Sequence, residues 1–323
     1  MKGKPRIVVI GSANIDLIMR VQRVPNPGET VHSGNFSQAA GGKGANQAVA
    51  CARLGADVEF VGRVGEDPFG ETVIKSLKNE GIKTKHLIHD PDHHTGIVVI
   101  LVDSVGQNAM IPDYGANLKL TPEDINSAEE AIKNADIMLL QHEVEESVNL
   151  RALTLARQHS VPVVLNPAPR VPQTMDSLKR AYLITPNLVE VIALAELAGA
   201  SISTEGSHID QAEMAARTLL GIGIENIVVT LGSEGSLYIS SEDKCYFKAL
   251  EVIPIDCTAA GDSFTAALAY CIAKGQSIPG AIPFASSAAA ITVTRPGAQP
   301  SLPTMNEIMD FIKSNNVKTD TKH

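Results

Sequence analysis

Short runs of apolar residues alternate with longer amphipathic segments through most of the chain. The first run lies at 6–11, where four consecutive β-branched residues end at a glycine, a pattern typical of a buried strand. The same patterns predict strands at 58–62, 137–141, 163–166, 182–185 and 227–230, and helices at 69–79 and 145–159. This rhythm predicts an α/β fold with a mostly parallel central sheet and helices on both faces. Ligands of such sheets bind at the carboxyl ends of the strands.

Two pairs of short, alternating runs depart from this rhythm and predict β-hairpins. The pairs are 15–21 with 30–36, and 96–103 with 108–111. Because both are flanked by α/β units, we expect them to form one small β lid over a larger domain. Such a lid would exclude water from a reaction beneath it.

The division of the chain follows from these patterns. We expect a single domain at 1–314, with a lid formed from about 15–38 and 95–113, and a polar C-terminal tail at 315–323. A chain of 323 residues is long enough to bury a large core.

Composition argues against two classes of partner. The net charge of −9 and the 4% of aromatic residues, with no Trp, disfavour a nucleic-acid partner, which needs a basic face and stacking side chains. No apolar run approaches the roughly 18 residues of a membrane span, and the run at 7–10 is too short for a signal peptide, so we expect a cytoplasmic protein. The 4 cysteines form no C-x-x-C pair, which indicates reduced thiols.

The stretch 256–264 carries the strongest chemical signal. Small residues precede an apolar helical pattern, which would leave unpaired backbone N–H groups at a helix N-terminus, ready to bind an anion. Asp262 stands on the first turn beside them. This combination suits phosphoryl transfer to a hydroxyl, although a capped helix that packs through its small residues has the same pattern.

Two other stretches carry polar groups in similar settings. Glycines at 41–44 run into an alanine-rich helix and are followed by Asn46, so they could hold a polyol, but the run lacks the Ser or Thr of a Walker A loop and could be a structural turn. Asn187 and Glu190 lie three residues apart where a helix begins after a strand, as an ordinary surface pair also could.

These three stretches together resemble the PfkB-type sugar kinases, and within them the ribose kinases. The likeness runs from the Gly-Ser-Ala-Asn-Ile-Asp motif at 11–16 to the Arg-Pro-Gly-Ala-Gln-Pro-Ser motif at 295–301. It implies transfer of the γ-phosphoryl group of ATP to the 5-hydroxyl of D-ribose, with Mg²⁺, K⁺ activation and a homodimer formed through the lid. A kinase for 2-deoxyribose, fructose or adenosine, or a silent sugar-binding protein, remains the alternative.

The resemblance assigns roles to individual positions. It implies that Asp262 is the catalytic base and that the backbone of Ala259, Ala260 and Gly261 forms the anion hole. Binding of the sugar is implied for Asn14, Asp16, Gly42, Lys43, Asn46, Glu143 and Asp262. Binding of the nucleotide is implied for Asn187, Glu190, Thr230, Gly232, Gly235, Gly261 and Ser286, with Val252 and Ile253 beside the adenine. A monovalent cation site is implied at Asp256, Thr258, Thr292, Arg295, Gly297 and Ser301.

Two features fall outside these roles. Cys257 stands where many family members have Thr; it is either a buried, inert thiol or a thiol made reactive by the helix N-terminus. Four histidines at 86, 89, 93 and 94 could suggest a metal, but the polar, turn-rich sequence around them favours a solvated loop.

Overall fold

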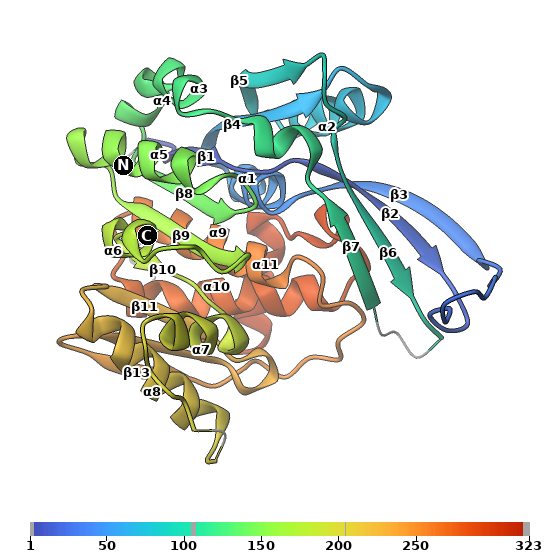
Figure 1. Ribbon diagram of the computed structural model, residues 1–323. Coiled ribbons are helices and arrows are strands. Elements are labelled where there is room, and N and C mark those ends of the chain that lie inside the picture. The colour runs from blue at the N-terminus through green and yellow to red at the C-terminus, as the bar shows by residue number, and fades with distance from the viewer. Residues whose placement is uncertain (1–2, 105–107, 204, 319–323) are drawn as a thin grey trace.

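The computed structural model describes residues 3–104, 108–203 and 205–318. It contains one 9-stranded sheet and one 4-stranded sheet (Figure 1). The large sheet has the spatial order β13 (Lys244–Phe247), β12 (Ser236–Ser240), β11 (Asn226–Thr230), β10 (Leu183–Ile184), β9 (Val163–Pro169), β8 (Ile137–His142), β1 (Arg6–Ile10), β4 (Asp57–Gly65) and β5 (Lys83–Asp90). Its strands pair in parallel except β12 and β13, which confirms the predicted fold class.

Helices cover both faces of this sheet, and each face has its own core. Along β1, Ile7 and Val9 pack into one core cluster and Val8 and Ile10 into the other, as the alternation of side chains in a strand requires. The first cluster includes residues of α1 (Lys43–Arg53), α2 (Pro68–Asn79), α9 (Ala260–Ala273), α10 (Ile278–Val293) and α11 (Met305–Ser314). The second includes residues of α3 (Pro122–Ser127), α4 (Glu129–Lys133), α5 (Glu146–Gln158), α6 (Asp176–Arg180), α7 (Leu188–Leu197) and α8 (His208–Gly221).

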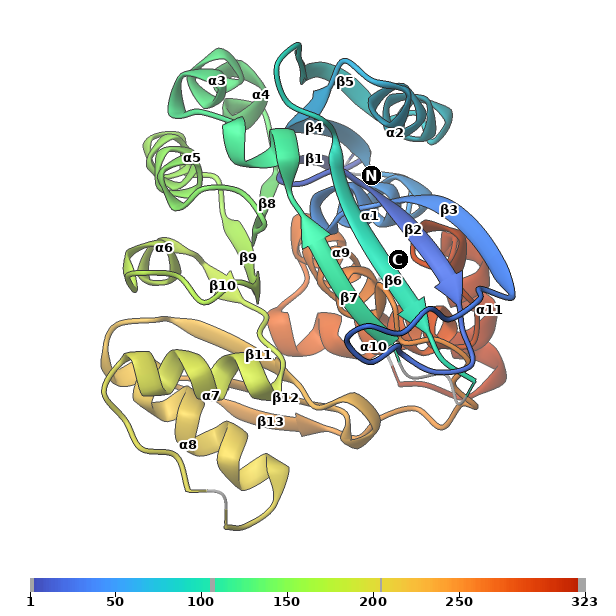
Figure 2. The same cartoon turned by 45° about the vertical axis from the view of Figure 1, so that its right-hand side comes forward.

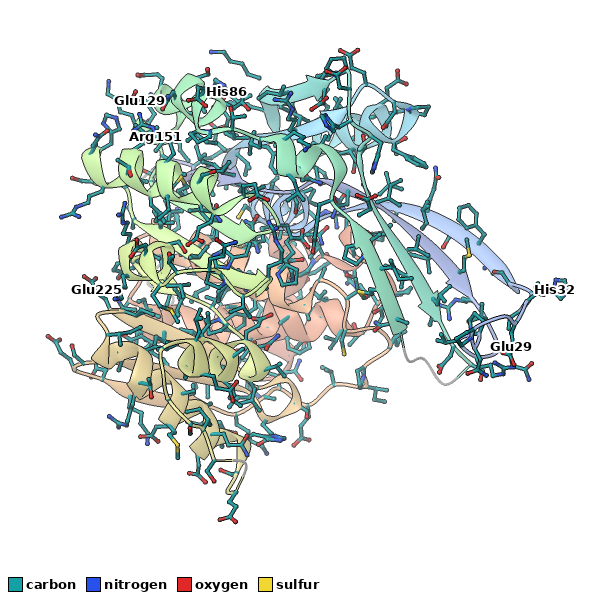
Figure 3. The ribbon with its side chains drawn as sticks, in the orientation of Figure 1. Glu29, His32, His86, Glu129, Arg151 and Glu225 are labelled. Carbon is teal, nitrogen blue, oxygen red and sulfur yellow. The ribbon has the colours of Figure 1, made fainter. Side chains whose placement is uncertain are left out.

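The small sheet projects from the body, to the right in Figure 1 and toward the viewer in Figure 2. Its order is β3 (Asn35–Gly41), β2 (Asn14–Arg20), β6 (Gly96–Val102) and β7 (Asn108–Asp113). The central pair β2–β6 is parallel and joins two antiparallel hairpins into one sheet. The sequence therefore predicted its strands well, with one error: the second strand runs over Asn35–Gly41 rather than 30–36, because it pairs with β2 along its whole length. Glu29 and His32 lie at the far tip of this lid (Figure 3).

Three other expectations concern the periphery. Within the described residues, no helix is both long and apolar enough to cross a membrane. The tail begins ordered, since Val317 donates its N–H to Ile312 and packs against the first core cluster. Residues 319–323 of the predicted tail, and 105–107 between β6 and β7, lie outside the described part of the chain.

The histidine-rich stretch is not simply a loop. His86 and His89 lie in β5, and only His93 and His94 follow it. His86 lies 3.4 Å from Glu59. His93 lies beside Asp90, and His94 lies beside Asp113. The described residues contain no group of three or more His, Cys, Asp or Glu side chains placed to hold a metal.

Candidate active site

The stretch 256–264 forms the bare helix N-terminus that its composition predicted. Ala259 precedes α9 in the left-handed conformation, with φ of 59°, and no side chain caps the helix. The N–H groups of Ala259, Gly261 and Asp262 donate to no acceptor among the described residues, whereas that of Ala260 lies 3.3 Å from the Cys257 carbonyl. Three unpaired donors therefore lie at this helix N-terminus, where partial positive charge gathers. The set differs from the predicted anion hole in one member: Asp262 takes the place of Ala260, whose N–H already has a partner.

Asp262 lies buried on the first turn of α9, with 4% of its surface exposed. Its Oδ2 accepts a 2.9 Å hydrogen bond from Asn46 Nδ2, and its Oδ1 accepts a 3.1 Å bond from Gln47 Nε2. Both donors come from α1, which packs against α9 in the first core cluster. The glycine motif and the stretch 256–264 thus meet at this carboxylate, where Gln47 and Asp262 are 215 residues apart in sequence.

The glycine motif begins α1 and is shaped by close backbone contacts. Gly42 has φ of 89°, and a Cβ there would lie 2.9 Å from the backbone of Ala13, so no other residue fits without strain. Lys43 begins the helix. Burial alone lowers the pKa of Lys43, but the carboxylates of Asp262, Glu143 and Glu190 together raise it. Its ammonium group therefore stays charged among buried acids.

Asn14 and Asp16 share one face of β2, where the lid joins the body. Asn14 Oδ1 accepts a 2.7 Å hydrogen bond from Asn117 Nδ2, which fixes the amide. Asp16 is 6% exposed and accepts no hydrogen bond from the described residues. Burial, followed by the charges of Glu143 and Asp262, raises the pKa of Asp16 to about 7.

Glu143 follows β8 and approaches the glycine motif from the other side. It accepts hydrogen bonds from the hydroxyl of Ser12 and, at 3.0 Å, from the backbone N–H of Lys43. Burial raises the pKa of Glu143 despite these partners. The structure thus gathers six predicted residues around one site: Asn14, Asp16, Lys43, Asn46, Glu143 and Asp262.

Asn187 and Glu190 form a capping box at the start of α7. Asn187 Oδ1 accepts from the N–H of Glu190, and Glu190 Oε2 accepts from the N–H of Asn187, each at 2.9 Å. The pair is therefore more than a surface pair. Burial raises the pKa of Glu190, and its charge reaches Lys43 and Asp262. Its second oxygen stays available to a ligand.

The residues of the predicted nucleotide loop lie around the connection from β11 to β12. Thr230 ends β11 and pairs with Asn187 in an isolated bridge, which joins this loop to the capping box. Gly232 and Gly235 have positive φ, and a Cβ at Gly235 would lie 2.0 Å from the Phe247 carbonyl oxygen. The loop is also the hairpin turn that its spacing allowed. Ser286 is half-buried in α10, whereas Ile253 is 85% exposed.

The proposed cation residues divide into two sets. Asp256 accepts hydrogen bonds from the N–H and hydroxyl of Thr258 and, at 2.8 Å, from the N–H of Gly297, so these three lie together. Burial alone raises the pKa of Asp256, but these bonds lower it. The side chains of the other three have different partners: Thr292 contacts the Ser263 hydroxyl and the Ala288 carbonyl, Ser301 donates to the Ala298 carbonyl, and Arg295 pairs with Glu307.

Sequence reasoning missed several residues of the site. Ser12, Asn117, Gln47 and Gln141 contact predicted site residues directly or through one neighbour. Ser12 lies within the motif at 11–16 and Gln47 adjoins Asn46, so these two had a local signal, whereas Asn117 and Gln141 had none. Cys257 is exposed, which excludes the buried thiol and leaves its reactivity a prediction.

Known proteins resemble this chain over most of its length. Residues 4–305 match the model of the pfkB family of carbohydrate kinases. Ribokinase of Staphylococcus aureus is 36% identical over 94% of this chain and 98% of its own, and deoxyribokinase of Salmonella typhi is 33% identical over 96% and 99%. Arabidopsis thaliana ribokinase, solved with ribose and ATP, superimposes with a TM-score of 0.87 at 32% identity, covering 96% of this chain and 99% of its own. The chain therefore belongs to the pfkB family of carbohydrate kinases.

Proposed function

We propose that this protein is an ATP-dependent ribokinase, which transfers the γ-phosphoryl group of ATP to the 5-hydroxyl of D-ribose. The observation that carries the proposal is the buried Asp262 carboxylate, which lies beside unpaired N–H groups and within a ring of polar side chains. The ribokinases among the relatives, and the ribose and ATP in the Arabidopsis structure, support the choice of substrates.

Unsatisfied polar atoms in the site fit a small polyol. Asn46 Oδ1 is buried without a hydrogen-bond partner in the described part of the chain, and the Asp16 carboxylate accepts no bond there. A buried acceptor without a donor is unfavourable, so sugar hydroxyls would supply what the protein lacks. Lys43 and the amide of Asn14 add donors to the same ring. Glu143 completes it on the side of β8.

Asp262 would receive the proton of the 5-hydroxyl while that oxygen bonds to the γ-phosphorus and the bond to ADP breaks. The N–H groups of Ala259, Gly261 and Asp262 would stabilise the charge that spreads over the phosphoryl oxygens. The charged Lys43 lowers the repulsion between the buried acids and the incoming nucleotide. In a loose transition state, this positioning matters more than the basicity of Asp262.

Magnesium and the nucleotide would be held on the other side of the anion hole. The Glu190 oxygen that the capping box does not use fits an ion that keeps its own waters and takes few carboxylates. Asn187 fixes that carboxylate, and Gly232, Gly235, Thr230 and Ser286 would line the nucleotide. Bound Mg²⁺ would neutralise phosphate charge.

A potassium ion fits the Asp256 loop through backbone carbonyls, because the side-chain oxygens there already have protein partners. The charge of Asp256 favours a cation nearby, and an ion would stabilise the loop that carries Thr258 and the helix N-terminus. Arg295 would act through its bond to Glu307 rather than as a ligand.

The lid would form the contact of a homodimer. Phe36 on β3 and Ile111 on β7 are 55% and 65% exposed, and the strand register places them on one face of the small sheet, whereas Met110, 48% exposed, lies on the other face. Large apolar side chains so exposed on one small sheet mark a surface that favours a partner.

Release of ADP tests the proposal. Purified protein with Mg-ATP should turn over ribose in preference to 2-deoxyribose, fructose and adenosine, and faster in potassium than in sodium buffer. Preference for another acceptor would show that the ribose-binding roles proposed for Asn14, Asp16 and Glu143 are wrong. No turnover with any acceptor would refute kinase activity.

A further inference from the structure

A line of buried amides lies behind the catalytic carboxylate. Gln47 Nε2 donates to Asp262 Oδ1 at 3.1 Å, and Gln141 Nε2 donates to Gln47 Oε1 at 2.7 Å. Both glutamines are 0% exposed. The line crosses three elements, β8, α1 and α9, and is closed to solvent at its glutamine end.

The charge state of Asp262 fixes the direction of this line. An ionised carboxylate only accepts hydrogen bonds, whereas a glutamine amide has a donor end and an acceptor end of nearly the same shape. Gln47 must therefore present its NH₂ to Asp262 and its oxygen to Gln141. Gln141 must in turn present its NH₂ to Gln47. A protonated Asp262 would allow the reverse orientation; an ionised one does not.

The far end of the line shows that this direction has a cost. Gln141 Oε1 is buried and has no partner among the described residues, and a Cβ at Gly11 would lie 1.9 Å from it. A glycine is thus needed to leave room for the oxygen. An unpaired buried acceptor is unfavourable. Within the described residues, the Gln141 oxygen stays unpaired beside Gly11 because both glutamines turn their NH₂ groups toward Asp262.

We propose that Gln47 and Gln141 are positioning residues for phosphoryl transfer, which hold Asp262 with Oδ1 turned to the core and with Oδ2, which also accepts a hydrogen bond from Asn46, turned toward the sugar hydroxyl. The proposal rests on the proposed function, because it needs Asp262 to be the base. Gln141 contacts Gln47 but not Asp262. Its substitution therefore tests the orientation of Gln47 without removing a direct contact to Asp262.

Substitutions that remove the donors test the line. Gln47→Met and Gln141→Met keep the volume and remove the NH₂ groups; kcat should fall about 10- to 100-fold in the first, the effect of one lost bond to a charged group. It should fall less in the second. The double variant should match Gln47→Met alone, because both act through one contact. KM for ATP should stay within about twofold, since the nucleotide loop is untouched.

Gln141→Glu gives the sharpest readout. When the introduced carboxyl group is protonated it can still donate to Gln47, but when ionised it only accepts and would turn the Gln47 amide, so that the amide oxygen faces Asp262. The kcat of this variant should therefore fall with rising pH relative to wild type. Gln158→Glu makes the same charge change on the exposed end of α5 and should follow the wild-type profile.

The outcomes separate the two proposals. Wild-type kcat in Gln47→Met, or parallel pH profiles for Gln141→Glu and Gln158→Glu, would overturn the positioning role; a lower melting temperature with unchanged kcat would show structural support only. If the wild-type protein phosphorylates no sugar, the proposed function fails instead. Crystal structures of wild type and Gln47→Met then decide: a turned Asp262 carboxylate supports the line, and an unmoved one refutes it.

Discussion

Replacement of Asp16 by Asn measures how much the buried Asp16 carboxylate lowers the free energy of unfolding. Burial and the charges of Glu143 and Asp262 raise the pKa of Asp16 from 3.8 to about 7. Between these values the folded protein binds more protons than the unfolded chain, so the free energy of unfolding falls as pH rises from about 4 to 7 and the loss is complete above 7. A shift of about three pH units corresponds to about 4 kcal/mol.

Asn has nearly the same shape and no charge, so it removes this term. Urea unfolding without sugar should show Asp16→Asn about 2–4 kcal/mol more stable than wild type at pH 8 and within about 1 kcal/mol of it at pH 4. KM for ribose should rise at least about tenfold, because an amide accepts hydrogen bonds from hydroxyls more weakly than a carboxylate does. KM for ATP should not change.

A control and a second assay sharpen the result. Asp310→Asn removes an exposed carboxylate on α11 and should change neither quantity. Calorimetry in buffers of different ionisation enthalpy should detect protons released when ribose binds the wild type near pH 7, since hydroxyl donors favour the ionised carboxylate, and none from Asp16→Asn. An equal stability change at pH 4 and 8, or a loss at pH 8, would refute the electrostatic account.

Three further substitutions, one of them with a matched control, test the site and the lid. Asp262→Asn should lower kcat about 10³-fold while calorimetry shows ribose and ATP binding nearly unchanged; a variant within tenfold of wild type contradicts its role as base. Gly235→Ala adds a Cβ at 2.0 Å from a backbone oxygen, so urea unfolding should show about 3 kcal/mol of destabilisation and KM for ATP should rise, whereas Gly221→Ala, with open space at the end of α8, should gain about 0.5–1 kcal/mol. Ile111→Asp should make the protein monomeric by light scattering at micromolar concentration; an unchanged dimer would exclude the lid as its interface.

The fold was readable from the sequence because burial on both faces leaves a simple pattern. Strands such as β1 are continuous β-branched runs, since alternate side chains enter different cores. The second lid strand was misplaced because its position depends on pairing with β2, which a local pattern does not contain. The hairpin turns before it are rich in polar residues, and β3 itself is mostly exposed, so no apolar run marks it.

Site residues that stand in short sequence motifs could be predicted from the sequence, whereas residues that reach the site only through long-range contacts could not. Short motifs placed Asp262, Asn46 and Asp16, because each stands beside glycines or at a strand end. Asn117 reaches Ala13 and Asn14 across more than 100 residues, and Gln141 reaches Gln47 across 94. Such contacts depend on how strands and helices pack, and the sequence around a polar residue does not show which distant residue it will contact.

The buried acids of the site differ in the hydrogen-bond donors that the protein places around them. Asp262 has an amide on each oxygen and Glu143 has a hydroxyl and a backbone N–H, so the protein holds both in place before substrate arrives. Asp16 has no such donor among the described residues, so no hydrogen bond offsets the burial and the charges of Glu143 and Asp262 that raise its pKa. Sugar hydroxyls are then the donors left for it, so ribose binding would relieve an unfavourable charge rather than add a new interaction to a satisfied one. A substrate lacking the hydroxyl that reaches Asp16 would leave that carboxylate unpaired, and discrimination against it would come from the protein's own unsatisfied group.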